Sequence, residues 1–393
     1  MRILYYVWNE FTGEDTRAVM RELGHDVEEL RYPWNRMDVD DGFDNVLENC
    51  LRMKKNGKAV DCVFTWNFFP IISRVCHRLH VPYISWIFDS PHFPLASKEV
   101  SNKENRIYLF DRGLVDLYKS LGIETVHYSP LAVNGVRLKA ISDSLMDYPC
   151  YEHDVTFLGN LYDNEYNFYD YTKEYLPKDL RIFFEDIMEK QRQTFVEDFI
   201  LDENIVSREK IQELNEYMKF SLSKESYDFD EDILIRDILK KKVTQDERRF
   251  LLEELGQKFK LDLYTKADGP TLRYVRDLGQ ADYMVRMPHI FNRSKINLNF
   301  MMRSIRTGMS LRVLDVMGVG GFLLSTYRSE LEEYFTDGQE LVIVRDRDEL
   351  ESKIEYFLEH EDERREIARL GQQKVLESFD YRKLLPGILQ ITG

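Results

Sequence analysis

The sequence has few cysteines, and their spacing matches no familiar kind of site. Cys50, Cys62, Cys76 and Cys150 form neither the short pairs of zinc and redox motifs nor a dense disulfide framework. The eight histidines are scattered and no Asp-x-Asp pair ends a predicted strand, so we expect no metal site and a metal-independent mechanism. We interpret the thiols as core residues in a reducing compartment, which predicts a cytoplasmic protein.

Positive charge and long apolar runs are scarce as well. The 393 residues include 54 Lys and Arg against 70 Asp and Glu, a formal net charge of −16. An acidic surface repels phosphate backbones and anionic lipids, which disfavours nucleic acid and membrane partners. The apolar run at residues 1–8 is too short to span a membrane and precedes no small-residue cleavage site, so we predict no transmembrane segment.

Internal repeats are absent, and short apolar runs instead alternate with segments of helical spacing. This alternation indicates a parallel sheet covered by helices on both faces, that is, a doubly wound α/β domain over residues 1–150. Its predicted helices include residues 16–23 and 71–79. Its predicted strands are residues 3–8, 27–30, 60–65, 81–88, 106–110 and 125–128.

A second α/β domain is predicted over residues 151–380, with a helical insertion at about 166–258 and a long amphipathic helical run at 349–377. The tail at 381–393 can cross back to the first domain. Two such domains face each other across a cleft at the carboxyl ends of their strands, where open α/β sheets bind ligands. The strands of this domain are predicted at 154–158, 261–264, 296–299, 321–325 and 341–344.

Residues 307–321 form the most informative motif. Gly308 lets the backbone approach a ligand closely, and Ser310 is a suitable N-cap for a helix over residues 311–319. Free amides and the positive dipole end of such a helix suit a diphosphate. The nearby arginines predicted to add charge-assisted hydrogen bonds are Arg303, Arg306 and Arg312.

Asp315 stands one turn into this predicted helix. Its carboxylate can accept both hydroxyls of a ribose, as acidic residues do in dinucleotide folds. The alternative is a capped structural helix in which Asp315 only pairs with Arg312. The residues alone leave both interpretations open.

Several stretches of the chain resemble the CgeB-like glycosyltransferase family, which takes its name from a spore maturation protein. In the second domain they are Ser-Lys-Ile-Asn-Leu-Asn at 294–299, Ser-Ile-Arg-Thr-Gly-Met-Ser-Leu-Arg-Val-Leu-Asp at 304–315 and Gly-Gly-Phe-Leu-Leu at 320–324. Upstream they are Ile-Ser-Trp-Ile-Phe-Asp-Ser-Pro at 84–91 and Leu-Phe-Asp-Arg at 109–112. The resemblance implies a GT-B fold and sugar transfer from a nucleotide-sugar, with UDP-sugar favoured, to a protein or glycan hydroxyl, with no further cofactor.

One position departs from the pattern of related enzymes. The family 4 retaining transferases carry two glutamates eight positions apart, the first near the sugar and the second on the ribose. Here Asp315 occupies the second position and Thr307 the first, so the usual acid is missing. Thr307 can hydrogen-bond a sugar hydroxyl in the catalytic centre but carries no charge, and the stereochemistry of transfer is not readable from this motif.

Further donor contacts are expected at strand ends. Gly159 and Asn160 follow the first strand of the second domain, where similar enzymes place a glycine turn against the phosphates, although an ordinary β-α turn has the same sequence. Lys266 can reach a phosphate or be merely solvated. Met287, before the helix start at Pro288, matches the position of a base contact. Met309 and Leu311 complete the diphosphate segment.

The acceptor side is expected at Asp89 and His92, which follow a buried strand of the first domain. Either side chain could deprotonate an acceptor hydroxyl if its pKa lies near neutrality, and the alternative is an Asp-Ser-Pro turn with a surface histidine. Asn9, Glu10 and Asp111 are rival groups at strand ends.

Three other functions stay open. A nucleotide-sugar epimerase would need no acceptor. A non-catalytic GT-B-fold binding protein would offer its acidic helical insertion to a partner. A dinucleotide-dependent oxidoreductase ranks last, because no Gly-x-Gly-x-x-Gly motif follows the first strand.

Overall fold

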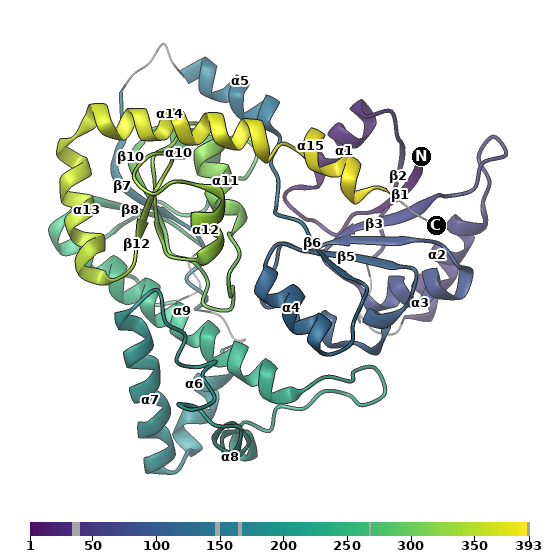
Figure 1. Cartoon of the computed structure of the whole chain (residues 1–393), viewed down its shortest axis with the longest axis horizontal. Coiled ribbons are helices and arrows are strands. Elements are labelled where there is room, and N and C mark those ends of the chain that lie inside the picture. Colours follow the sequence, from purple (N-terminus) through teal and green to yellow (C-terminus); the bar gives the residue numbers. More distant parts are fainter. Residues whose placement is uncertain (34–39, 146–149, 164–166, 267–268, 391–393) are drawn as a thin grey trace.

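The computed structural model describes residues 1–33, 40–145, 150–163, 167–266 and 269–390. These residues form two α/β lobes, each built on a six-stranded parallel sheet, and a group of helices below the C-terminal lobe (Figure 1). Both sheets are flanked by helices, so the predicted pair of doubly wound domains is confirmed.

The N-terminal lobe has strand order β2-β1-β3-β4-β5-β6, and the predicted strands lie where expected. The central strands are apolar and buried on both faces, as helices covering a parallel sheet require. The strands are β1 (Arg2–Tyr6), β2 (Asp26–Leu30), β3 (Cys62–Trp66), β4 (Tyr83–Trp86), β5 (Asn105–Leu109) and β6 (Val126–Tyr128). The helices are α1 (Gly13–Glu22), α2 (Asp41–Arg52), α3 (Pro70–Leu79), α4 (Arg112–Ser120) and α5 (Gly135–Leu145).

The C-terminal lobe has strand order β12-β11-β10-β7-β8-β9. Its strands are β7 (His153–Leu158), β8 (Leu261–Tyr264), β9 (Arg276–Asp277), β10 (Ser294–Asn299), β11 (Leu323–Thr326) and β12 (Val342–Val344). Its helices are α10 (Arg286–Asn292), α11 (Leu311–Gly318), α12 (Ser329–Tyr334), α13 (Arg347–Glu359) and α14 (Glu361–Ser378). The run predicted at 349–377 is thus two helices, which meet at His360.

The insertion between β7 and β8 contains α6 (Phe168–Thr172), α7 (Lys178–Gln193), α8 (Arg208–Met218) and α9 (Glu231–Lys258). Its segment before α9 reaches the N-terminal lobe, where the amide of Lys98 donates to the carbonyl of Ser226 over 3.1 Å and that of Asp228 to Ala96 over 3.2 Å. The insertion therefore bridges the two lobes.

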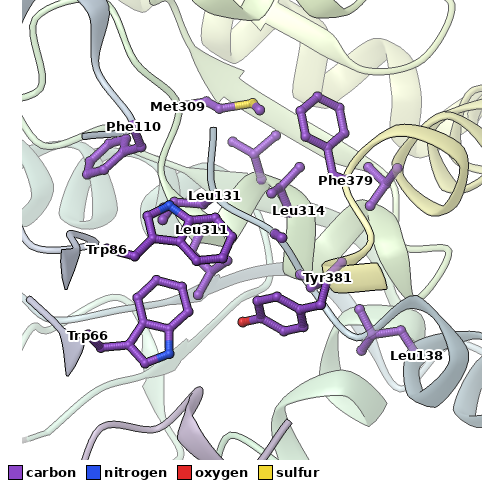
Figure 2. Packing of buried hydrophobic residues seen from close by; sticks show 14 of the residues in the cluster. Trp66, Trp86, Phe110, Leu131, Leu138, Met309, Leu311, Leu314, Phe379 and Tyr381 are labelled. Carbon is purple, nitrogen blue, oxygen red and sulfur yellow. The ribbon is translucent and has the colours of Figure 1, made fainter. Parts of the chain in front are cut away.

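One continuous hydrophobic core joins the lobes. The chain returns after α14, where residues 133 and 380 form a parallel bridge, and α15 (Tyr381–Ile388) packs on α1 of the N-terminal lobe. Figure 2 shows Tyr381 beside Trp66 and Trp86 of the N-terminal sheet, with Leu311 and Leu314 of α11 in the same cluster. The start of α11 is therefore fixed against the other lobe.

Candidate functional site

The carboxyl ends of β5 and β10 meet at the junction of the lobes through a buried carboxylate. Asp111 caps α4 and also accepts hydrogen bonds from the amide of Arg306 (2.6 Å) and the amide and hydroxyl of Thr307 (3.2 and 2.8 Å). Thr307 Oγ1 in turn accepts from the amide of Gly113 over 2.9 Å. The segment ahead of α11 is thus tied to the N-terminal lobe.

A second buried carboxylate closes the same junction from α12. Glu330 accepts from the amide of Arg112 (2.8 Å) and from the hydroxyl of Tyr128 (2.6 Å). Its Oε1 also lies 2.8 Å from Thr307 Oγ1, whose one proton can be donated either to Glu330 or to Asp111. Burial raises the pKa of Glu330. We call the contacts of Asp111, Thr307 and Glu330 the interlobe junction. The position that lacks its usual acid therefore lies between two other carboxylates.

Position 308 must be a glycine for a different reason than the sequence suggested. A Cβ there would lie 2.6 Å from the carbonyl oxygen of Phe110 and 2.9 Å from the Cα of Asp111. What approaches Gly308 closely in this structure is the N-terminal backbone rather than an open ligand space, because the lobes are packed together. Met309 and Leu311 also point into the interlobe core (Figure 2).

The first turn of α11 has no side-chain cap. Ser310 takes the extended N-cap conformation, but its hydroxyl accepts no hydrogen bond from the helix. Within the described residues this buried Oγ has no hydrogen-bond partner at all. An uncapped helix start that also holds an unused hydroxyl is suited to an anionic ligand.

Three of the predicted donor contacts come together on the side of α11. Arg312 Nη1 lies 2.8 Å from the sulfur of Met287 and 3.4 Å from Asp315 Oδ2, and Tyr283 donates to Asp315 Oδ1 over 2.8 Å. The pKa of Asp315 is raised from 3.8 to about 6, because the effect of burial outweighs the opposing effect of the Arg312 charge. Burial also lowers the pKa of Arg312. The pairing of Asp315 with Arg312 agrees with both sequence interpretations.

The turn after β7 is held by an arginine that sequence reasoning missed. Arg248 of α9 donates to the carbonyls of Asn160 and Phe300, and its guanidinium lies 5.0 Å from the ring centroid of Tyr162. The positive charge of Arg248 also lowers the pKa of Arg312. Arg248 lies in a charge-rich helical stretch typical of a solvent-facing surface, so no local signal marked it. Gly159 donates its amide to Tyr264 over 3.0 Å, and Lys266 is exposed after β8.

Two predicted arginines turn away from α11. Arg303 is buried, forms an ion pair with Glu247 of α9 and donates to the carbonyls of Gln191 and Thr194. Arg306 lines a separate cavity that it shares with Lys240 and Arg328. Of the three arginines expected near the diphosphate, Arg312 alone lies beside Asp315.

The predicted acceptor residues line a small cavity at the junction of the lobes. Asp89 is exposed and accepts from Asn67 Nδ2 over 2.7 Å. His92 lies with Nε2 2.9 Å from the carbonyl oxygen of Phe68, and burial lowers its pKa. Asp237 of α9 lines the same cavity, and burial raises its pKa to about 6. Helix α9 thus supplies a carboxyl that the sequence did not mark.

Aromatic side chains form a second contact between the lobes, separate from the interlobe junction. Phe11 packs against Phe88 of the N-terminal lobe and Tyr283 of the C-terminal lobe, with ring centroids 5.0 and 4.8 Å apart. Phe11 is 44% exposed, so part of its ring is available to a ligand. Of the rival polar groups, Glu10 forms an ion pair with Arg17, and Asn9 adopts a φ of 73° at the end of β1.

Within the described ranges, no group of three or more His, Cys, Asp or Glu side chains is arranged to hold a metal ion. None of the described helices combines the length and the apolar character that a bilayer span requires.

Comparison with known proteins gives the fold its class. Residues 245–390 match the family described as glycosyl transferase-like. A sucrose-phosphate synthase from Thermosynechococcus elongatus shares the fold with a TM-score of 0.54 at 9% identity, over 99% of this chain and 97% of that one. Anabaena Alr3699/HepE in complex with UDP-glucose is similar with a TM-score of 0.50 at 12% identity, over 99% of this chain and 98% of that one. No curated protein matches the sequence.

A third structure, a glycosyltransferase from Rickettsia africae, is similar with a TM-score of 0.50 at 12% identity over 100% of this chain and 99% of that one. The fold is thus that of the two-lobed GT-B glycosyltransferases. With the family match over its C-terminal lobe, the chain is a glycosyltransferase.

Proposed function

We propose that this protein transfers a sugar from a UDP-sugar to a hydroxyl group of a protein or glycan, as a cytoplasmic member of the CgeB-like subtype. The observation that carries the proposal is the uncapped start of α11, where the unpartnered hydroxyl of Ser310 adjoins Arg312 and Asp315. Alr3699/HepE, which has the same fold, was solved with UDP-glucose.

The diphosphate is proposed to bind at the amides of Ser310 and Leu311. Arg312 and Arg248 would supply the positive charge, since Arg248 is buried and Arg312 is partly buried near this turn. In this arrangement the helix dipole and two guanidinium groups stabilise the leaving diphosphate, which makes the proposed mechanism metal-independent. Gly159 and Asn160 would complete the phosphate site from the β7 turn, with Lys266 as an outer cation. Arg306, which lines a separate cavity, is left out of this site.

The nucleoside is proposed to lie along α11 toward α10. Asp315 would accept the ribose hydroxyls, because its carboxylate is held in place by Tyr283 and Arg312 at one side of the turn. Met287 and its neighbouring backbone would contact the base. An ionised Asp315 is required, so donor affinity should decline as the pH falls below about 6.

The acceptor is proposed to enter from the N-terminal lobe. Its hydroxyl would lose a proton to Asp89, which is exposed and oriented by Asn67. His92 shapes the neighbouring cavity, and the exposed part of the Phe11 ring offers an apolar surface for a sugar ring. Thr307 would contribute by holding the interlobe junction together. This junction excludes water when the lobes are packed together.

Titration calorimetry with UDP, GDP, CDP, dTDP and UDP-sugars tests the proposal. Wild-type protein is expected to bind UDP, and Asp315→Ala to weaken that binding at least about tenfold, the loss expected for about 1.4 kcal/mol. Asp348→Ala removes an equal charge from the exposed start of α13 and should bind like wild type. Equal UDP affinity in all three proteins would refute the assigned donor site. Binding without transfer to any acceptor would favour a non-catalytic protein instead.

A further inference from the structure

A cavity at the other end of the C-terminal sheet contains four arginines. It lies beside the starts of β7 and β10, away from α11's first turn, and has a volume of about 410 Å³. Helices α5 and α14, which contact each other at the top of this lobe in Figure 1, form two of its walls. The arginines are Arg293 at the end of α10 and Arg364, Arg365 and Arg369 on α14.

Two of these arginines are buried without a compensating carboxylate. Arg293 is 8% exposed and donates to the carbonyls of Cys150 and Leu145. Arg364 is 1% exposed and donates through Nη1 to the carbonyl of Phe357, while its Nε and Nη2 have no partner in the described part of the chain. Neither forms an ion pair there. Burying charge without a counter-ion is costly, so two such cations beside one cavity favour an anion.

The other two arginines carry charge to the rim. Arg365 and Arg369 are about half exposed, and among the described residues they form ion pairs with a glutamate of their own helix, Glu361 and Glu366 respectively. Surface pairs of this kind are weak, so both guanidinium groups are available to a ligand. The ring of Tyr151 lies 5.1 Å from the Arg364 guanidinium and 5.6 Å from that of Arg365.

The remaining lining suits a small polar molecule. Ser142, Asn292 and Gln372 offer hydrogen-bonding groups, and Leu145, Phe322 and Ala368 offer apolar contact. The volume falls in the range of small-ligand pockets. A protein with a net charge of −16 gathers four cations here, which is a local reversal of its overall field.

We propose that this arginine pocket is a second ligand site, distinct from the donor site, that binds a small molecule carrying a phosphate or diphosphate group. The phosphate lies among Arg293, Arg365 and Arg369, and the buried positive charge of Arg364, next to the ring of Tyr151, adds to its attraction. The rest of the ligand contacts the α5 wall. This site goes beyond the proposed transfer reaction, because none of its residues belongs to the α11 turn.

Calorimetric titration of the full chain with pyrophosphate, in the presence of saturating UDP that occupies the proposed donor site, tests the proposal. The variant is Arg365→Gln with Arg369→Gln, whose exposed positions leave the core intact. Its matched control is Arg31→Gln with Arg52→Gln, which removes two exposed arginines that also pair with glutamates, on the N-terminal lobe. We expect wild type and control to bind pyrophosphate at this site, and the variant to lose at least tenfold in affinity while its affinity for UDP at the donor site is kept.

Other outcomes overturn the proposal. Unchanged pyrophosphate affinity in the α14 double variant would show that the arginine pocket binds no phosphate. Binding of heparin without binding of pyrophosphate would assign the arginines to a large polyanion and exclude a small ligand. Failure of the donor-site proposal appears separately, as UDP affinity that does not depend on Asp315.

Discussion

Replacing Asp315 by asparagine is expected to stabilise the protein while it weakens donor binding. Burial raises the pKa of Asp315 from 3.8 to about 6. Each pKa unit corresponds to about 1.4 kcal/mol, so the ionised carboxylate at pH 7 destabilises the fold by about 3 kcal/mol relative to its neutral form. Asparagine keeps an oxygen that can accept from Tyr283 and carries no charge.

The sign of the pH dependence follows from the raised pKa. Stability linked to this group is fully present below pH 3.8 and is lost as the pH rises through about 6, because the unfolded chain releases the proton first. The advantage of Asp315→Asn over wild type should therefore grow by about 2 kcal/mol between pH 4.5 and pH 7. A buried charge kept at such a cost is typical of functional sites.

Urea unfolding of both proteins at the two pH values measures this difference, and UDP titration at pH 7 measures the binding loss. The control is Asp348→Asn, an exposed carboxylate on α13, which should change neither quantity. A stability difference that is the same at both pH values would refute the assigned pKa. Unchanged UDP affinity in Asp315→Asn would refute the role of its charge.

Three further predictions concern the junction, the β7 turn and the acceptor side. Gly308→Ala should push the lobes apart, because its Cβ would lie 2.6 Å from the Phe110 carbonyl; we expect a stability loss of about 1–3 kcal/mol and a larger radius of gyration by X-ray scattering, with Gly387→Ala unchanged. Arg248→Met should weaken UDP binding at least about tenfold, because the variant loses both its charge near the phosphates and the hydrogen bonds that hold the turn at Asn160. The much weaker binding of uridine, which has no phosphate, should change less. Asp89→Asn should lower kcat by about 10²- to 10⁴-fold in a transfer assay with unaltered UDP affinity, and a normal kcat would exclude Asp89 as the base.

Much of the fold was predictable because its signals are local. Buried parallel strands are apolar on both faces, so runs such as residues 3–8 and 81–88 marked β1 and β4 without reference to the rest of the chain. Ser310 likewise marked the start of α11 from its position before an apolar helical stretch. These elements depend on neighbouring residues, which the sequence displays directly.

The missed features depend on residues far apart in the chain. Arg248 reaches Asn160 from 88 positions away, and Arg303 is drawn from the diphosphate segment by Glu247, 56 positions before it. Gly308 was predicted to let the backbone approach a ligand, whereas the group that approaches it in the structure is the backbone of residues 110–111. Tertiary contacts of this kind leave no periodic trace, so sequence reasoning could name the segment but not its partners.

A crystal structure of the complex with UDP would test the central claim most directly. The account predicts phosphate oxygens within about 3 Å of the amides at Ser310 and Leu311, with the ribose hydroxyls on Asp315. UDP bound elsewhere, with the first turn of α11 still packed against the N-terminal lobe and free of ligand, would contradict it.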